Sequence, residues 1–178
     1  MYGNGQVADN PKDAGALAGN VNKNPSLALS RFQAAEHFLD NQPNVKKGEL
    51  AALGYCFGGG VVLNMARAGE PLKAVVTYHG VLATDVAIKP GDIKASLRIF
   101  HGEADPIVPP AQVEAFKVEM DNAKADYMLV SYPGVKHTFT NREADSYAVQ
   151  FGLPLKYDNE ADTDSWTRTQ EFLKATLH

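Results

Sequence analysis

The chain has 178 residues, of which 44% are hydrophobic and 21% are charged, and 17 basic against 21 acidic side chains give a formal net charge of −4. These values are typical of a folded domain and argue against wholesale disorder. The mildly acidic balance disfavours nucleic acid and anionic membrane surfaces as partners. No apolar run reaches the roughly 18–20 residues that a membrane span needs. The one cysteine, Cys56, allows neither an internal disulfide nor a zinc site built from several cysteines.

The first 26 residues are rich in glycine, proline and asparagine. This composition favours loops and turns, and we predict an irregular N-terminal segment over residues 1–24. Because a structureless stretch of this length is unusual in a compact domain, we expect the chain to be a fragment, or to begin in the middle of a domain. An intact protein with an unstructured N-terminal arm is the alternative. The stretch has neither the basic start nor the apolar centre of a signal peptide.

From Pro25 onward, amphipathic helical patterns alternate with short apolar runs that are typical of buried strands. Residues 141–162 fit neither pattern and are predicted to be an irregular loop with room for one short helix. The alternation predicts one α/β domain over residues 1–178, with a mostly parallel sheet covered by helices on both faces. Helices are predicted at residues 25–41, 61–68, 110–122 and 163–177, and strands at residues 49–55, 74–78, 97–101 and 127–132.

In an open parallel sheet, ligands bind at the carboxyl ends of the strands. The first predicted strand is followed by Gly54-Tyr55-Cys56-Phe57-Gly58-Gly59-Gly60. The spacing Gly-x-Cys-x-Gly matches the nucleophile elbow, a sharp turn from strand to helix, with cysteine in place of serine. We expect side chains at positions 54 and 58 to clash with neighbouring backbone, which would explain the two glycines.

The predicted turn places Cys56 at a helix N-terminus, where the helix dipole favours a thiolate. The N–H of Phe57 would point into the same space and could hold a developing oxyanion. The structural alternative is that Cys56 is a small buried apolar residue. A phosphate-binding loop is excluded, because no Gly-Lys-Ser/Thr follows the glycines.

Two further polar residues follow predicted strands, in the nucleophile–acid–base order typical of α/β-hydrolases. Asp105 lies at a proline-flanked turn after the third strand, where a carboxylate can orient an imidazole. His137 follows the fourth strand and is the candidate general base. Glu103 is the rival acid, and we favour Asp105 because Glu103 lies nearer the strand end. Each residue also has an ordinary explanation, since Asp105 could cap the turn and His137 could be a surface residue.

Tyr78 and His79 come at the end of the second predicted strand and reach the same rim, so we predict that they line a substrate pocket. His101 is expected to end a strand and pack. The sequence contains no His-Glu-x-x-His and no Cys-x-x-Cys motif, so it indicates no metal and no cofactor.

The segments GYCFGGG, HGEADPIVPP and YPGVKHTFTNREAD closely resemble the three catalytic segments of the dienelactone hydrolase family, within the α/β-hydrolase fold. The opening MYG resembles the family segment just after an early sheet strand, so the resemblance covers essentially the whole chain and omits the family's first strands. It implies an α/β-hydrolase-like three-layer sandwich that is truncated at its N-terminus. By this resemblance, Cys56 is the nucleophile, His137 the general base, Asp105 the residue that orients the imidazole, and Phe57 the donor of one oxyanion N–H.

The resemblance also implies an activity. Members of the family hydrolyse small carboxylic esters or lactones, as carboxymethylenebutenolidases do, through an acyl-enzyme. Members that act on dienelactone hold the substrate carboxylate with arginines, and Arg142 is the nearest match, set one place further along than expected. Thr138, directly after His137, is a further candidate for substrate binding. A second oxyanion donor, and a glutamate that contacts the resting cysteine, would belong to the part of the family that this chain omits.

Two alternatives to this ester hydrolase stay open. One is a truncated, inactive module of the same fold, and the other is a thioesterase, since the three residues alone do not choose between ester types. Missing strands would expose a sheet edge, which predicts a homo-oligomer formed through that edge. A single cysteine is compatible with a cytoplasmic location.

Overall fold

The computed structural model describes residues 1–177. Contacts within the chain divide it into two units, Met1–Lys47 and Gly48–His178. The first unit contains the helices α1 (Pro11–Asn22) and α2 (Pro25–Asp40), and α2 confirms the helix predicted there. The single domain predicted over the whole chain stays a prediction.

The prediction of an irregular segment over residues 1–24 is wrong for its second half, where helix α1 forms. The side chain of Asn10 caps the helix by accepting a hydrogen bond from the Asp13 N–H at 3.0 Å. Pro11 takes the first helical position, where its missing N–H costs nothing. A good cap contributes about 1 kcal/mol, which is comparable to the cost of one glycine inside a helix. Composition alone therefore does not predict this helix, because it does not take the N-terminal cap into account.

The second unit is built on four strands, all parallel and hydrogen-bonded in the order β1-β2-β3-β4. Tyr55 pairs with Tyr78, and Tyr78 pairs with Phe100, so the carboxyl ends of the strands meet at one edge of the sheet. Each of the four predicted strands is confirmed. Their bounds are β1 (Ala51–Tyr55), β2 (Ala74–Tyr78), β3 (Ser96–Gly102) and β4 (Tyr127–Tyr132).

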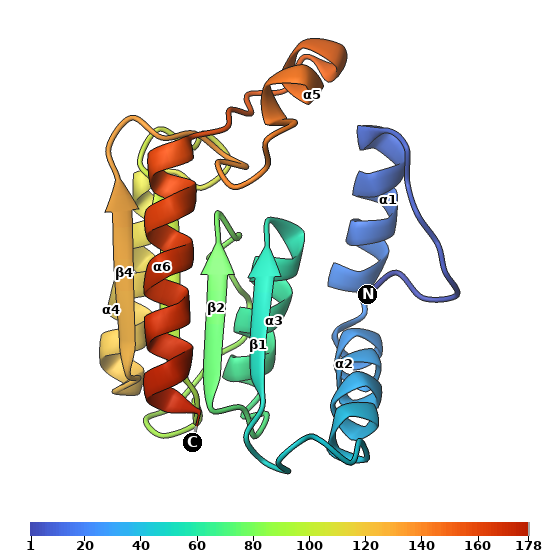
Figure 1. The fold of residues 1–178 in the computed structure, drawn as a ribbon, viewed down its shortest axis with the longest axis vertical. Coiled ribbons are helices and arrows are strands. Elements are labelled where there is room, and N and C mark those ends of the chain that lie inside the picture. The colour runs from blue at the N-terminus through green and yellow to red at the C-terminus, as the bar shows by residue number, and fades with distance from the viewer. Residues whose placement is uncertain (178) are drawn as a thin grey trace. The chain divides into compact units, whose positions relative to one another are not determined.

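Four helices complete the second unit, and three of them, α3, α4 and α6, form layers on the two faces of the sheet, whereas α5 lies beyond the strand ends (Figure 1). Helices α3 and α4 cover one face, and α6 crosses the other, where it packs on β2. The three-layer α/β architecture with a parallel sheet is thus confirmed. The helices are α3 (Phe57–Arg67), α4 (Pro110–Ala123), α5 (Ala144–Phe151) and α6 (Asn159–Thr176).

Alternation along the strands gives each face of the sheet its own core. Val76, Tyr78 and Phe100 are buried together with Phe172 of α6, on the face that α6 covers. Burying one large apolar side chain contributes about 1.5–3 kcal/mol, so this cluster is a main source of stability for the second unit. The cluster lies directly beneath the strand ends and therefore fixes the floor of the region where the candidate residues gather.

Helix α6 differs from its prediction in its buried face. The sequence places Trp166 on an apolar stripe, but this side chain is 46% exposed, whereas Ser165 and Thr169 are fully buried. The reason is a buried phenol: the Tyr78 hydroxyl shares a hydrogen bond with the Thr169 hydroxyl. Thr169 thus faces the core because a buried tyrosine needs a partner, which a hydrophobic pattern does not register. Ser165, also buried, donates its hydroxyl to the carbonyl of Asp162 within the helix.

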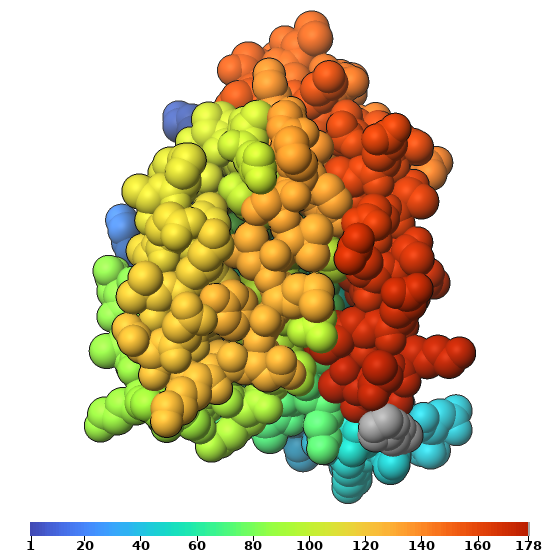
Figure 2. Space-filling view, turned by 90° about the vertical axis from the view of Figure 1, so that its left-hand side faces the viewer, coloured from blue at the N-terminus to red at the C-terminus, as the bar shows by residue number. Residues whose placement is uncertain are grey.

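The sheet edge formed by β4 is visible at the surface between α4 and α6 (Figure 2). The homo-oligomer predicted from an exposed edge stays a prediction. None of the helices within residues 1–177 is both long and apolar enough to span a membrane.

Candidate active site

Cys56 occupies the sharp turn between β1 and α3. Its backbone lies at φ 51° and ψ −119°, a region that costs a residue with a side chain about 1–3 kcal/mol. The turn is held by a hydrogen bond from the Cys56 N–H to the carbonyl of Tyr78 at 3.1 Å. The thiol is exposed at the carboxyl edge of the sheet. This is the geometry of a nucleophile elbow, as the sequence predicts.

The glycines around Cys56 are not equivalent. A side chain on Gly54 would overlap the carbonyl group of Gly58, so the expected clash at position 54 is confirmed. The clash expected at position 58 is wrong, because nothing lies within 4 Å of a Cβ built there. The second crowded position is instead Gly59, where a Cβ would overlap the Thr77 hydroxyl. Close packing of α3 on β2, rather than the elbow itself, explains that glycine.

His137 joins the thiol to a buried carboxylate. Its Nε2 lies 3.2 Å from Cys56 Sγ, and its Nδ1 lies 2.6 Å from Asp105 Oδ2. The second carboxylate oxygen of Asp105 accepts a hydrogen bond from the Ile107 N–H at 2.8 Å. Both His137 and Asp105 are buried, so water competes little for these hydrogen bonds. The three residues form a continuous line from thiol to carboxylate, as a nucleophile, a base and an orienting acid require.

Backbone hydrogen bonds join the loop that carries Asp105 to the loop that carries His137. The Ala104 N–H donates to the carbonyl of Val135 at 2.9 Å, and the Glu103 N–H donates to that of Tyr132 at 3.0 Å. Glu103 itself is exposed, whereas Asp105 is 3% exposed and contacts His137. The structure therefore brings Asp105, and not the rival Glu103, to the imidazole.

The three side chains shift one another's pKa values. Partial burial raises the pKa of Cys56, but the hydrogen bond and charge of His137, together with the Phe57 N–H, lower it below the ordinary thiol value. Burial opposes protonation of His137, yet its hydrogen bonds to Asp105 and Cys56 raise the pKa of His137 to about 9. Burial also raises the pKa of Asp105, but His137 and the Ile107 N–H lower it further. These shifts favour transfer of the thiol proton from Cys56 to His137.

The N–H of Phe57, at the start of α3, acts on the Cys56 side chain and helps to lower its pKa. This N–H is therefore a backbone donor beside the thiol, and its role toward an oxyanion stays a prediction. The positive end of the α3 dipole points at the same atoms.

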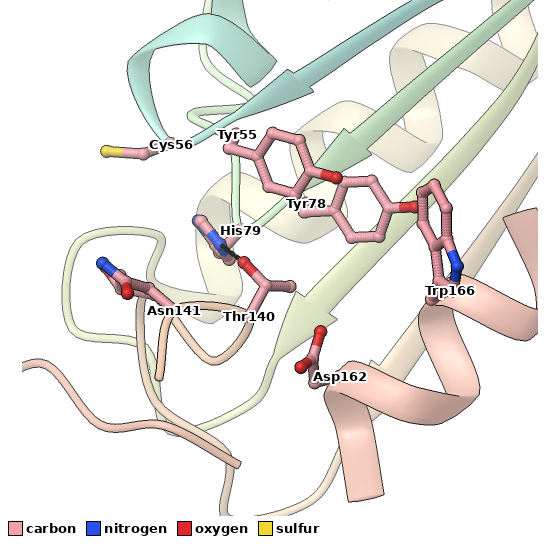
Figure 3. Close-up of a pocket in the computed structure, with 9 residues that line it drawn as sticks. Tyr55, Cys56, Tyr78, His79, Thr140, Asn141, Asp162 and Trp166 are labelled. Atoms are coloured by element: carbon pink, nitrogen blue, oxygen red, sulfur yellow. Dashed lines mark hydrogen bonds between the residues drawn. The ribbon is translucent and has the colours of Figure 1, made fainter. Parts of the chain in front are cut away.

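A cavity of about 530 Å³ opens beside the thiol (Figure 3). Four of the residues that line it were expected from the sequence, namely Cys56, Tyr78, His79 and Thr138. The remaining lining residues were not expected, and they are Tyr55, Thr140, Asn141, Asp162 and Trp166. Asp162 and Trp166 come from the first turns of α6, although the sequence predicts a loop at Asp162 and a buried position for Trp166.

His79 lies behind the cavity as a buried and neutral ring. Burial, and then the charge of His137, lower the pKa of His79 to about 3. Its Nε2 shares a hydrogen bond of 2.9 Å with the Thr140 hydroxyl, and its ring meets the edge of His137 at 5.0 Å between centroids. His79 therefore packs against the ring of His137 and adds no charge to the cavity.

Tyr78 forms the floor of the cavity and holds a second aromatic ring in place. It is 1% exposed, and its ring stacks on that of Tyr55 with the centroids 4.5 Å apart. Thr138, at φ 63°, lines the cavity next to the base. Arg142 is not brought to the site: it is exposed, and its neighbour Asn141 lines the cavity instead.

The chain that follows His137 returns to it before α6 begins. The Lys156 N–H donates to the carbonyl of His137 at 3.2 Å, and the Asp158 N–H donates to that of Phe139 at 3.1 Å. Residues 140–155, which include α5, thus form an excursion whose two ends are held together. The same contacts fix where α6 starts, and so where its first turn meets the cavity.

Within residues 1–177 no three histidine, cysteine, aspartate or glutamate side chains gather in a way that could hold a metal ion. The chemistry available at the site is that of a thiol, an imidazole and a carboxylate.

Comparisons with known proteins give the family of the chain. The sequence profile of the dienelactone hydrolase family matches residues 1–177. An uncharacterized protein of Caenorhabditis elegans is 35% identical over 147 residues, which cover 81% of this chain and 90% of that protein. A Synechocystis protein, provisionally named carboxymethylenebutenolidase, is 26% identical over 157 residues, which cover 84% of this chain and 59% of that protein.

Among solved structures, a dienelactone hydrolase-like promiscuous phosphotriesterase from metagenomic libraries superimposes with a TM-score of 0.86 at 31% identity. The match covers 100% of this chain and 73% of the phosphotriesterase. Together with the elbow at Cys56 and the parallel sheet beneath it, these matches show that the chain belongs to the dienelactone hydrolase family.

Proposed function

We propose that the chain hydrolyses small carboxylic esters or lactones through an acyl-enzyme on Cys56. The observation that carries this proposal is the line of contacts from Cys56 Sγ through His137 to Asp105, at 3.2 and 2.6 Å. Membership of a hydrolase family supports the reaction class, and the cavity of about 530 Å³ beside the thiol can accept a small substrate.

In the first half-reaction the Cys56 thiolate attacks the carbonyl carbon of the ester and forms a C–S bond. The carbonyl π electrons move to oxygen, and the Phe57 N–H stabilises the resulting oxyanion. The proposal is supported by the action of this N–H on the Cys56 side chain. When the oxyanion collapses, the bond to the leaving oxygen breaks. The imidazolium of His137 donates its Nε2 proton to that oxygen, and the alcohol departs, or stays attached to the acyl group when the substrate is a lactone.

In the second half-reaction neutral His137 takes a proton from water while the hydroxide attacks the thioester carbonyl. Collapse of this second oxyanion breaks the C–S bond, releases the carboxylic acid and returns Cys56 as a thiolate beside the imidazolium. Asp105 keeps the Nδ1 proton of His137 in place in both steps, so that Nε2 always faces the thiol.

Hydrolysis of a panel of oxygen esters, lactones and thioesters tests the proposal. We expect turnover of oxygen esters or lactones, and we expect Cys56→Ala to abolish it while the far-UV circular dichroism spectrum is retained. Cys56→Ser should also lose most of the activity, because an alcohol is far less acidic than a thiol and the site is arranged for a thiolate.

The panel also separates the two alternatives. Turnover of thioesters alone would establish a thioesterase, and a folded chain without turnover of any class would establish an inactive module. Turnover that survives in Cys56→Ala would overturn the role of the thiol.

A further inference from the structure

The wall of the cavity that α6 provides combines a carboxylate with aromatic surface. Asp162 and Trp166 lie one helical turn apart, and both line the cavity together with the stacked rings of Tyr55 and Tyr78 (Figure 3). Trp166 is 46% exposed and Tyr55 is 44% exposed, so their surfaces are accessible to a ligand.

The cavity has no positive side chain to balance this carboxylate. Neither lysine nor arginine is among the residues that line it, and His79 is neutral because its pKa is lowered to about 3. When Cys56 and His137 share one proton, as the proposed reaction requires, the set of Cys56, His137 and Asp105 carries one net negative charge, whether the proton resides on sulfur or on the imidazole. Two net negative charges, one from this set and one from Asp162, therefore face a ligand in the cavity.

Neither an ion pair within residues 1–177 nor helix capping accounts for the position of Asp162. It belongs to none of the ion pairs found within residues 1–177, and its contact is a hydrogen bond from the Tyr157 hydroxyl at 3.0 Å. Asp158 already caps α6 by accepting a hydrogen bond from the Ala161 N–H at 3.0 Å.

The negative charge of Asp162 affects two tyrosines that line the cavity. Burial raises the pKa of Tyr55 and of Tyr78, and the negative charge of Asp162 raises both further. The carboxylate thus acts on the same aromatic surface that a ligand would contact.

We propose that Asp162, Trp166 and Tyr55 form a subsite for a cationic group of the substrate, such as a quaternary or protonated amine. The proposal refines the ester hydrolysis described above and rests on it. A cation would lie against aromatic faces, whose quadrupole attracts positive charge, and beside a carboxylate without a cationic partner. An anionic substrate would meet two negative charges and no lysine or arginine in the lining. The site therefore prefers cationic esters to neutral ones, and neutral esters to anionic ones.

Choline and its uncharged isostere 3,3-dimethylbutan-1-ol test the subsite directly. Trp166 is the only tryptophan of the chain, so its fluorescence reports binding in the cavity without any need for turnover. We expect choline to bind about fivefold more tightly than the alcohol, the factor expected of a partly exposed ion pair. Asp162→Asn should remove this difference and leave binding of the alcohol unchanged.

Glu160→Gln is the matched control. Glu160 also lies in the first turn of α6 and the substitution removes the same charge, but the side chain is exposed and does not line the cavity. We expect it to leave choline binding as in the wild type. If Asp162→Asn fails to fold, salt dependence in the wild type replaces it: added NaCl should weaken binding of choline and not of the alcohol. Equal affinity for both ligands, or choline binding that is insensitive to both Asp162→Asn and salt, would overturn the subsite.

Hydrolysis separates this inference from the proposed function. The ratio of kcat/KM for butyrylcholine to that for 3,3-dimethylbutyl butyrate should fall about fivefold in Asp162→Asn, and comparison between enzymes cancels the different reactivity of the two esters. If neither ester is hydrolysed while choline still binds near Trp166, the proposed function fails and the cation subsite stands. If both are hydrolysed with the same ratio in wild type and Asp162→Asn, the subsite fails and the proposed function stands.

Discussion

The carbonyl group of Val135 occupies the space that a side chain on Gly102 would need. Gly102 ends β3, and Val135 lies two residues before His137. This contact therefore keeps the backbone after β3, which carries Asp105, close to the loop that carries His137. The Ala104 N–H donates to the same carbonyl at 2.9 Å. The separation of Asp105 and His137 is therefore set by the backbone as well as by their own hydrogen bond.

Gly102→Ala should damage the site without touching any of its side chains. The new Cβ must displace the backbone at Val135, and we expect the free energy of unfolding to fall by about 1–3 kcal/mol. The same displacement should separate the acid from the base and lower ester hydrolysis. Urea unfolding and the hydrolysis rate measure the two effects, and wild-type values for both would show that the loops do not depend on this contact.

Alanine substitutions at Gly54 and Gly58 should have opposite effects on stability. Gly54→Ala should lower the free energy of unfolding by about 1–3 kcal/mol, because its Cβ would overlap the Gly58 carbonyl group. Gly58→Ala meets nothing within 4 Å and should stabilise α3 by up to about 1 kcal/mol. Thermal unfolding of the two variants is the measurement. Equal destabilisation by both would restore the explanation, drawn from the sequence, that both glycines avoid clashes.

Alkylation of Cys56 by iodoacetamide should reveal the coupling of the thiol to His137. Cys56 is the only cysteine, so the label reports one site. Its pKa is lowered chiefly by His137 against the effect of burial, so the wild type should react well below the pKa of about 8.5 of a free thiol. His137→Ala should move the pH profile upward and slow the reaction at pH 6.5 several-fold, because the thiolate is the reactive form.

The control for alkylation is His37→Ala, which removes an exposed histidine of α2. Its pH profile should match that of the wild type. A profile that both histidine substitutions leave unchanged would mean that the thiol and His137 are not coupled in solution.

Stability should depend on pH through Asp105. Its pKa is lowered in the folded chain, so its contribution is present above the unfolded pKa of about 4 and is lost as the pH falls through the folded value. Asp105→Asn should cost on the order of 3 kcal/mol at pH 7, because it leaves the imidazolium of His137 buried without its partner. Urea unfolding from pH 7 to pH 3 should show this difference shrinking, and a difference that stays constant would contradict the assignment.

His137 should act with the opposite sign. Because its pKa is raised to about 9, its contribution is fully present below the unfolded pKa of about 6.5 and is lost as the pH rises through 9. His137→Gln should therefore flatten the decline in stability between pH 7 and pH 10, measured by urea unfolding.

The sheet and the grouping of three residues could be predicted because they follow from local patterns and one rule of topology. Each strand is a short apolar run between glycine, proline or polar residues, and parallel strands end at one edge of the sheet. The structure brings Cys56, Asp105 and His137 together at that edge, within hydrogen-bond distance. Their catalytic roles stay predictions until turnover is measured.

The far wall of the cavity could not be predicted, because it depends on contacts between distant parts of the chain. The hydrogen bond between Tyr78 and Thr169 joins residues 91 positions apart and turns the polar face of α6 inward. That rotation leaves Trp166 at the cavity rather than in the core. A hydrophobic pattern predicts that a segment is helical, but the face of the helix that turns inward depends on the residues against which it packs.

The excursion over residues 140–155 is a segment that relatives of this chain can vary while His137 stays in place. Its ends are held by the hydrogen bonds from Lys156 to His137 and from Asp158 to Phe139, so its length and sequence can change while the imidazole stays in place. Thr140 and Asn141, within the excursion, also line the cavity. Exchanging this segment between relatives should therefore exchange the range of substrates accepted and leave the bond-breaking step as it was.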